Sequence, residues 1–198
     1  MAERARNDRK PHAGPAPTEQ VLHETALNHL ARYGTTRAGL IRVLDRRVDR
    51  WARRVEADPE TVAAQVSLGR AAARVVADKL VAAGTVDDAA FAASRARGLA
   101  RAGRSRRAVA AHLQARGVAS ELVREAVSDD PDTELAAALA FARRRRIGPF
   151  RREELDQESA LRELGMMARA GYMRDVANTA LRMDADEATD RINRSRRP

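Results

Sequence analysis

The stretch SRRAVAAHLQARGVASELVREAV, residues 105–127, predicts two short amphipathic helices that are separated by a turn at Gly117. Val109 and Leu113 lie at helical spacing before that turn. A second stretch, SALRELGMMARAGYMRDVANTAL at 159–181, repeats the pattern at an offset of 54 residues. Because one such copy is too small to bury its apolar face alone, copies of this kind stack on one another. The sequence therefore predicts an all-α fold of tandem three-helix repeats in an extended array.

Turn residues and apolar spacing along the rest of the chain predict nine helices in three groups of three. We expect them over about 18–33, from Thr36 to the break at Asp58-Pro59, 60–82, 88–102, 105–117, 120–127, 132–146, 153–170 and 173–182. The offset of 69 residues that aligns repeat 1 with repeat 2 fails after Leu44, which predicts an insertion near 49–66. The expected organisation is a disordered tail at 1–17, repeats at 18–84, 85–130 and 131–183, and a disordered tail at 184–198.

Composition excludes several classes of protein. Only 3% of the residues are aromatic and much of the apolar share is alanine, which favours close-packed helices over large sheets or deep pockets. The chain has no cysteine, so disulfides and thiolate zinc sites are excluded. No apolar stretch approaches the roughly 20 residues that span a bilayer. The first residues, MAERARNDRKP, are not a secretory signal, and we expect a cytoplasmic protein.

The net charge of +9 points to a negatively charged partner. The chain has 37 basic residues, of which only Lys10 and Lys79 are lysines. GC-rich codons account for the ratio of arginine to lysine, but they do not account for the excess of basic over acidic residues. A pI near 11.1 favours a polyanion such as DNA, or an acidic protein surface, as the partner.

Two adjacent aspartates, Asp87 and Asp88, are the strongest candidates for a catalytic or metal site. They precede a predicted helix, and with Thr85 as N-cap they fit a capping box, in which acids also suit the helix dipole. A metal-dependent nuclease that uses both aspartates is the alternative, but the four histidines have no metal-ligand spacing. The sequence also has no nucleophile elbow and no glycine-rich phosphate loop. We therefore expect no catalytic residues, no metal and no cofactor.

The arginines gather in three clusters that contain few acids. Residues 32–54 hold eight arginines and two aspartates, residues 95–124 hold eight and one glutamate, and residues 141–152 hold six and no acid. A solvated face is the plain interpretation, although such faces normally interleave acids with bases. Arg95 is expected to reach a carboxylate between helices. The candidate contact residues are Arg97, Arg101, Arg104, Arg106, Arg107, Arg143, Arg144, Arg145, Arg146, Arg151 and Arg152.

The middle of the chain resembles the second repeat of the RecX family of recombination regulators. That repeat has a glycine, an aspartate pair, a phenylalanine, and then glycine, valine and leucine at fixed spacing before a turn. The matching residues are Gly84, Asp87, Asp88, Phe91, Gly103, Val109, Leu113, Gly117 and Val118. The resemblance extends over about 18–183, and it is weakest in repeat 1.

The resemblance implies an elongated, curved monomer that binds filaments of the RecA recombinase on DNA. It also implies that the protein restrains ATP hydrolysis and strand exchange without catalytic residues of its own. Weak, non-specific contact with single- and double-stranded DNA fits the basic clusters. The alternative is a plain DNA-binding or transcriptional regulator, because the two helices around Gly103 are loosely similar to a helix-turn-helix.

Overall fold

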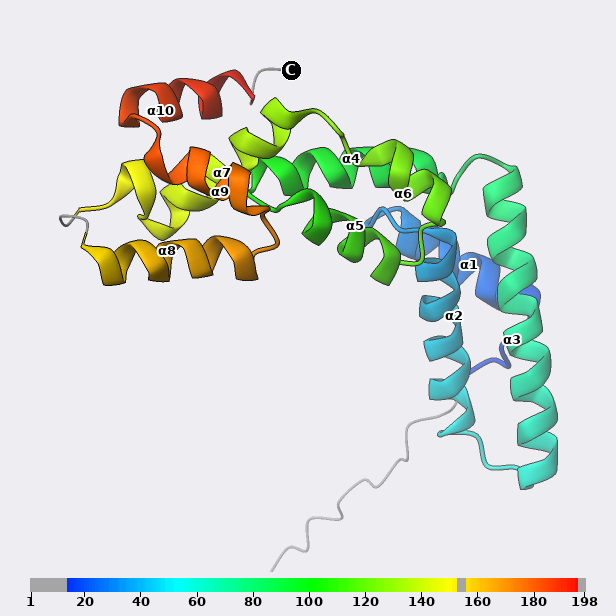
Figure 1. Cartoon of the computed structure of the whole chain (residues 1–198). Coiled ribbons are helices and arrows are strands. Elements are labelled where there is room, and N and C mark those ends of the chain that lie inside the picture. The colour runs from blue at the N-terminus through cyan, green and yellow to red at the C-terminus, as the bar shows by residue number, and fades with distance from the viewer. Residues whose placement is uncertain (1–13, 153–155, 196–198) are drawn as a thin grey trace, which may run out of the picture. The chain divides into compact units, whose positions relative to one another are not determined.

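The structure is a computed structural model that describes residues 14–152 and 156–195. Within those ranges it is all-helical, with ten α-helices, one 3₁₀-helix and no strand (Figure 1), which confirms the predicted fold class. The elements are α1 (Glu19–Leu30), α2 (Arg37–Ala52), α3 (Pro59–Ala82), α4 (Asp88–Arg101), α5 (Arg106–Ala115), α6 (Ser120–Ala126), α7 (Pro131–Arg145), η1 (Gly148–Phe150), α8 (Gln157–Arg169), α9 (Arg174–Arg182) and α10 (Ala185–Arg194). None of these helices has the length and apolarity needed to cross a membrane.

The chain folds as two compact units, Met1–Asp87 and Asp88–Pro198. Buried apolar residues form three clusters, one within α1–α3, one within α4–α6 and one within α7–α10. The first unit holds one cluster and the second unit holds two. The elongated, curved array predicted for the whole chain stays a prediction.

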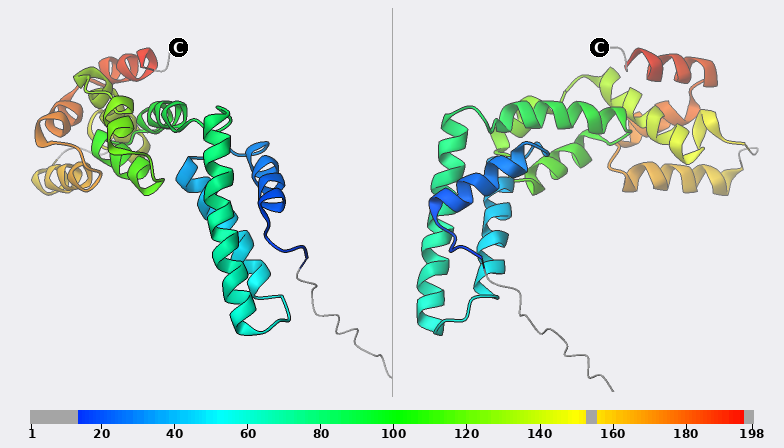
Figure 2. Two further views of the ribbon diagram at one scale, coloured as in Figure 1. Left: turned by 90° about the vertical axis from the view of Figure 1, so that its right-hand side faces the viewer. Right: turned by 180° about the vertical axis from the view of Figure 1, so that it is seen from behind.

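In the first unit, α2 and α3 lie side by side along much of their length (Figures 1 and 2), and α1 packs across them. One apolar face of α2 is buried, from Leu40 through Leu44 to Trp51. With 16 and 24 residues, α2 and α3 are much longer than α5 and α6, which have 10 and 7. The segment near the predicted insertion therefore extends a helical hairpin. Asp58 does not end α2, which ends at Ala52; instead its side chain caps the start of α3.

In the second unit, the repeat inferred from the offset of 54 residues reappears in the backbone. Gly117 ends α5 with φ 83°, and Gly171 ends α8 with φ 91°. After each glycine, the N–H of the following residue donates back to a carbonyl of the helix that has just ended. Val118 donates to Leu113 and Tyr172 donates to Met167, both at 3.2 Å, and the two acceptor residues are fully buried. A positive φ favours glycine, which explains why both turns carry one.

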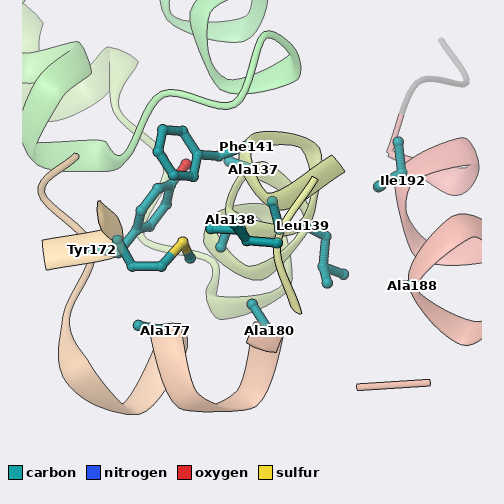
Figure 3. Packing of buried hydrophobic residues seen from close by; sticks show 12 residues of the cluster. Ala137, Ala138, Leu139, Phe141, Tyr172, Ala177, Ala180, Ala188 and Ile192 are labelled. Atoms are coloured by element: carbon teal, nitrogen blue, oxygen red, sulfur yellow. The ribbon is translucent and has the colours of Figure 1, made fainter. Parts of the chain in front are cut away.

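The largest cluster of buried residues surrounds α7 (Figure 3). The rings of Phe141 and Tyr172 meet at a centroid distance of 5.8 Å and a tilted angle of 56°. The alanines around Leu139 leave room for α9 to approach α7, because small side chains allow helix axes to lie close together. Ile192 of α10 closes the cluster on another side.

The predicted disordered tail at 184–198 is wrong for most of its length, because α10 forms there. Asp184 caps this helix by accepting the N–H groups of the second and third residues after it, at 2.8 and 3.2 Å. Ala188 and Ile192 lie on one face and are buried against the α7 cluster. Arg191 also donates to Asp132 of α7 at 2.9 Å. Of the other predicted tail, residues 1–13 lie outside the described part of the chain.

The two aspartates stand at a helix start, as predicted, because α4 begins at Asp88. The expected role of Thr85 as N-cap is wrong, since both Val86 and Asp87 lie between it and the start of α4. The N–H groups of Thr85 and of the residue after it instead donate to the Leu80 carbonyl, at 2.9 and 3.2 Å, and thereby close the end of α3.

Candidate nucleic-acid interface

The turn between α4 and α5 packs directly on α7 because it contains a glycine. Gly103 is buried with φ 75°, and a Cβ atom built there would lie 2.6 Å from the backbone N of Phe141. No other residue type fits this approach without a shift of one helix. Arg144 of α7 adds a hydrogen bond to the Ala102 carbonyl at the end of α4. The basic ends of α4 and α7, which are far apart in the sequence, therefore lie together.

Buried polar contacts fix the start of α5 in the same region. Ser105 is fully buried; its Oγ accepts from the Ala108 N–H at 3.3 Å and donates to the Ala170 carbonyl at 2.7 Å. Glu134 of α7, only 5% exposed, accepts from the Arg106 N–H at 2.9 Å. Burial raises the pKa of Glu134, while that N–H and the charge of Arg106 lower it. These contacts hold α5 against α7 and the α8–α9 turn.

Two of the predicted arginine clusters meet at this junction. Arg101 from α4 and Arg143 and Arg144 from α7 line one shallow hollow of about 250 Å³. Arg97 and Arg104 are exposed beside it. Within the described residues, no hydrogen bond or ion pair joins Arg97, Arg101 or Arg104 to another side chain. These three candidate contact residues are therefore available to an external anion.

The four side chains of Arg143–Arg146 have different surroundings at the end of α7. The guanidinium groups of Arg144 and Arg145 lie 5.6 and 5.7 Å from the ring centroid of Phe141, within the range of a cation–π contact. Arg143 is half-buried, and Arg146 follows the helix with a left-handed backbone, at φ 56°. The helix end thus spreads positive charge over several faces while the stems cover apolar surface.

Two of the candidate arginines have acidic partners within the chain. Arg106 Nη1 lies 3.4 Å from Asp129 Oδ1, and Arg106 Nε lies 4.0 Å from Glu134 Oε2. Arg151 makes a forked contact with Glu163, at 3.2 Å to Oε1 and 2.8 Å to Oε2. Glu163 is only 7% exposed, so this pair holds the segment after α7 against α8. A role of either arginine in contacting a partner stays a prediction.

Arg95 reaches no carboxylate among the described residues, contrary to the expectation. Its Nε donates to His112 Nε2 at 3.2 Å, which links α4 to α5. Burial lowers the pKa of His112, and the charges of Arg95, Arg116 and Arg104 lower it further. A low pKa favours the neutral imidazole, which is the form whose nitrogen can accept this hydrogen bond.

The structure also shows basic residues that the sequence reasoning missed. Arg162 and Arg169 of α8 line the same hollow as Arg146, Arg151 and Arg152. Acids interleave with them in the sequence, so a count of local charge does not single them out. The signal was their spacing of seven residues, which places both on one face of a helix. Across residues 14–152 and 156–195, no three histidine, aspartate or glutamate side chains converge as metal ligands would.

The chain is similar in sequence to known regulatory proteins of the RecX family. The family model of the second three-helix domain of RecX matches residues 87–127. The regulatory protein RecX of Myxococcus xanthus is 34% identical over 181 residues, which cover 88% of this chain and 93% of that protein. Its counterpart in Agrobacterium fabrum is 37% identical over 105 residues, or 53% and 56% of the two chains. That of Mycobacterium marinum is 41% identical over 107 residues, or 52% and 60%. No solved structure gives a significant match.

Proposed function

Because the chain belongs to the RecX family of regulatory proteins, we propose that it binds filaments of the RecA recombinase on DNA and restrains their ATP hydrolysis and strand exchange. It acts in the cytoplasm as a monomer, without a catalytic step or a cofactor. The single observation that supports this proposal best is the junction of α4 and α7, where Arg101 meets Arg143 and Arg144 around one hollow.

The exposed arginines at that junction suit a polyanion better than a small ligand. Arg97, Arg101 and Arg104 are spaced along about two turns of helix and of the turn that follows, so they can follow a row of phosphates. Each phosphate contact releases condensed counterions, which supplies affinity without reading base sequence. Contacts of modest strength in more than one repeat then add up, because the second contact forms within an existing complex.

Co-sedimentation tests the proposal. The full chain is mixed with RecA filaments on single-stranded DNA, with the DNA alone and with RecA alone, and ATP hydrolysis is followed in parallel. The triple variant R97A/R101A/R104A should bind the filament less tightly and restrain hydrolysis less. The matched control is R174A/R182A/R194A, which removes three exposed arginines from α9 and α10. The proposal is wrong if the parent chain neither sediments with the filament nor slows its ATP hydrolysis. If both triple variants restrain hydrolysis as the parent chain does, the function stands and Arg97, Arg101 and Arg104 are not the contact residues.

The same experiment separates the alternative, a DNA-binding regulator that does not act on the recombinase. Such a protein would sediment with bare DNA as well as with filaments, and it would leave ATP hydrolysis unchanged at concentrations that saturate the DNA. Family membership and the lack of a base-reading helix at the α4–α5 pair both favour the filament.

A further inference from the structure

A second hollow, of about 550 Å³, lies in the second unit between α8 and residues 146–152, which follow α7. Its described lining contains a single acid, Glu163, and no aromatic side chain. Its basic lining residues are Arg146, Arg151, Arg152, Arg162 and Arg169. This hollow is separate from the α4–α7 junction, which is lined by other residues.

The acid neutralises only one of the five arginines. Glu163 accepts hydrogen bonds from Arg151 Nε at 3.2 Å and from Arg151 Nη2 at 2.8 Å. It also accepts one from the Gly148 N–H at 3.1 Å. Its oxygens therefore have three donors already. Asp156 lies near Arg162, but its Oδ1 accepts the Ser159 N–H and caps α8. The other four guanidinium groups make no hydrogen bond or ion pair within the described residues.

The backbone holds three of these four groups, those of Arg146, Arg162 and Arg169, around the hollow. Arg162 and Arg169 are two turns apart on one face of α8. The space beside Gly165 admits the Arg169 guanidinium, because a Cβ atom there would lie 3.2 Å from its Nη1. Arg146 stands at the opposite rim in a left-handed conformation that side-chain-bearing residues seldom adopt. Gly148, at φ 59°, fixes that rim, since its Cβ would lie 2.9 Å from Leu181 Cα.

We propose that this hollow is a binding site for phosphate groups. Four guanidinium groups that form no hydrogen bond or ion pair within the described residues repel one another, and an anion between them offsets that repulsion. Guanidinium groups match the oxygens of phosphate through paired hydrogen bonds. The lining offers no aromatic platform for a base, so the phosphate itself is what is recognised. The volume lies within the range of small-molecule sites and accommodates a short polyphosphate or one or two phosphates of a nucleic-acid backbone.

Two sources can supply that phosphate group: the DNA backbone or a free polyphosphate. Occupancy by DNA rests on the proposed function, whereas phosphate binding itself does not. If DNA is the source, the protein contacts it at two places, the α4–α7 junction and this hollow in the third repeat.

Calorimetric titration of the full chain with inorganic tripolyphosphate tests the site. The variant R162A/R169A should bind tripolyphosphate about tenfold more weakly or worse, because it removes two charged hydrogen-bond partners. The matched control R174A/R182A removes two exposed arginines of α9 and should change affinity by less than about twofold. Circular dichroism checks that each variant keeps its helices. Equal affinity of R162A/R169A and the control would overturn the proposal.

A parallel titration with a thymidine oligonucleotide identifies the source. If DNA occupies the hollow, R162A/R169A weakens oligonucleotide binding as well as tripolyphosphate binding. If only tripolyphosphate binding is weakened, the site is confirmed and its occupant is a free phosphate compound. Co-sedimentation of R162A/R169A with filaments is scored separately, so loss of this site and failure of the proposed regulatory function give different results.

Discussion

At the scale of single residues, the arrangement of the candidate surface depends on one glycine. The N–H of Gly103 donates to the Ala100 carbonyl at 2.8 Å and thereby closes α4, while the missing Cβ lets the turn touch Phe141 of α7. Both requirements, a positive φ and a close approach, exclude other residues. Arg144 then reaches the Ala102 carbonyl only because the turn is this close.

We predict that Gly103→Ala destabilises the second unit by about 2–5 kcal/mol, from left-handed strain and overpacking together. Urea unfolding followed by far-UV circular dichroism measures the change. Gly98→Ala is the matched control, because nothing lies within 4 Å of its Cβ position on α4 and alanine favours helix by up to about 1 kcal/mol. Trp51, the chain's single tryptophan, is buried in the first unit. The urea concentration at which its fluorescence reports half-unfolding should therefore be the same as in the parent chain. A stable G103A variant would contradict the close packing.

The sequence predicted this glycine turn, but it did not predict the contact across it. Local rules identify Gly103 as a helix end because glycine favours positive φ. They do not say which helix lies against the turn, since that depends on residues some 40 positions away. The same limit applies to Arg95, whose partner is His112 and not a carboxylate, and to Arg106 and Arg151, whose acids come from other elements.

At the scale of elements, α10 shows why a charged segment can still form part of the fold. Its sequence, ADEATDRINR, has only Ala188 and Ile192 as buried residues, so composition indicated a tail. Spacing of four residues places the two on one face, and Asp184 supplies the cap. Most of the other helices were predicted to within a few residues, because their apolar stripes are longer and their ends carry glycine, proline or a capping side chain.

We predict that Ile192→Ala destabilises the second unit by about 2–4 kcal/mol, because it removes a side chain that is 1% exposed. Proteolysis should then cleave α10 before the rest of the unit. Leu161→Ala serves as the control, since Leu161 is 67% exposed and its loss should cost no more than about 0.5 kcal/mol. If I192A unfolds at the same urea concentration as the parent chain, α10 does not contribute to the core in solution.

At the scale of the whole molecule, the apolar residues and the arginines are distributed differently. The apolar residues build three separate cores, whereas the arginines on α4, α7 and α8 surround two hollows of the second unit. The sequence predicted the first of these surfaces through local counts of charge. Of the second it predicted Arg146, Arg151 and Arg152 but missed Arg162 and Arg169, because α8 alternates acids with bases and only the fold turns these two bases toward the hollow.

The salt dependence of DNA binding tests whether the junction of α4 and α7 contacts phosphate. Binding of the parent chain should fall steeply with salt, because each phosphate contact releases counterions into solution. For R97A/R101A/R104A, the slope of log K against log salt should flatten by about 0.7–0.9 for each contact that is lost. Fluorescence anisotropy with a labelled oligonucleotide, between about 50 and 200 mM salt, measures both slopes.

The control R174A/R182A/R194A removes the same net charge from other elements of the second unit, so a general loss of positive charge affects both triple variants alike. Direct contact flattens the slope only for the α4 variant. Its helices should persist, because the three altered side chains are exposed and the apolar face of α4 is unchanged. An unchanged slope would mean that Arg97, Arg101 and Arg104 form a solvated face, and the polyanion would then have to bind at the α8 hollow or in the first unit.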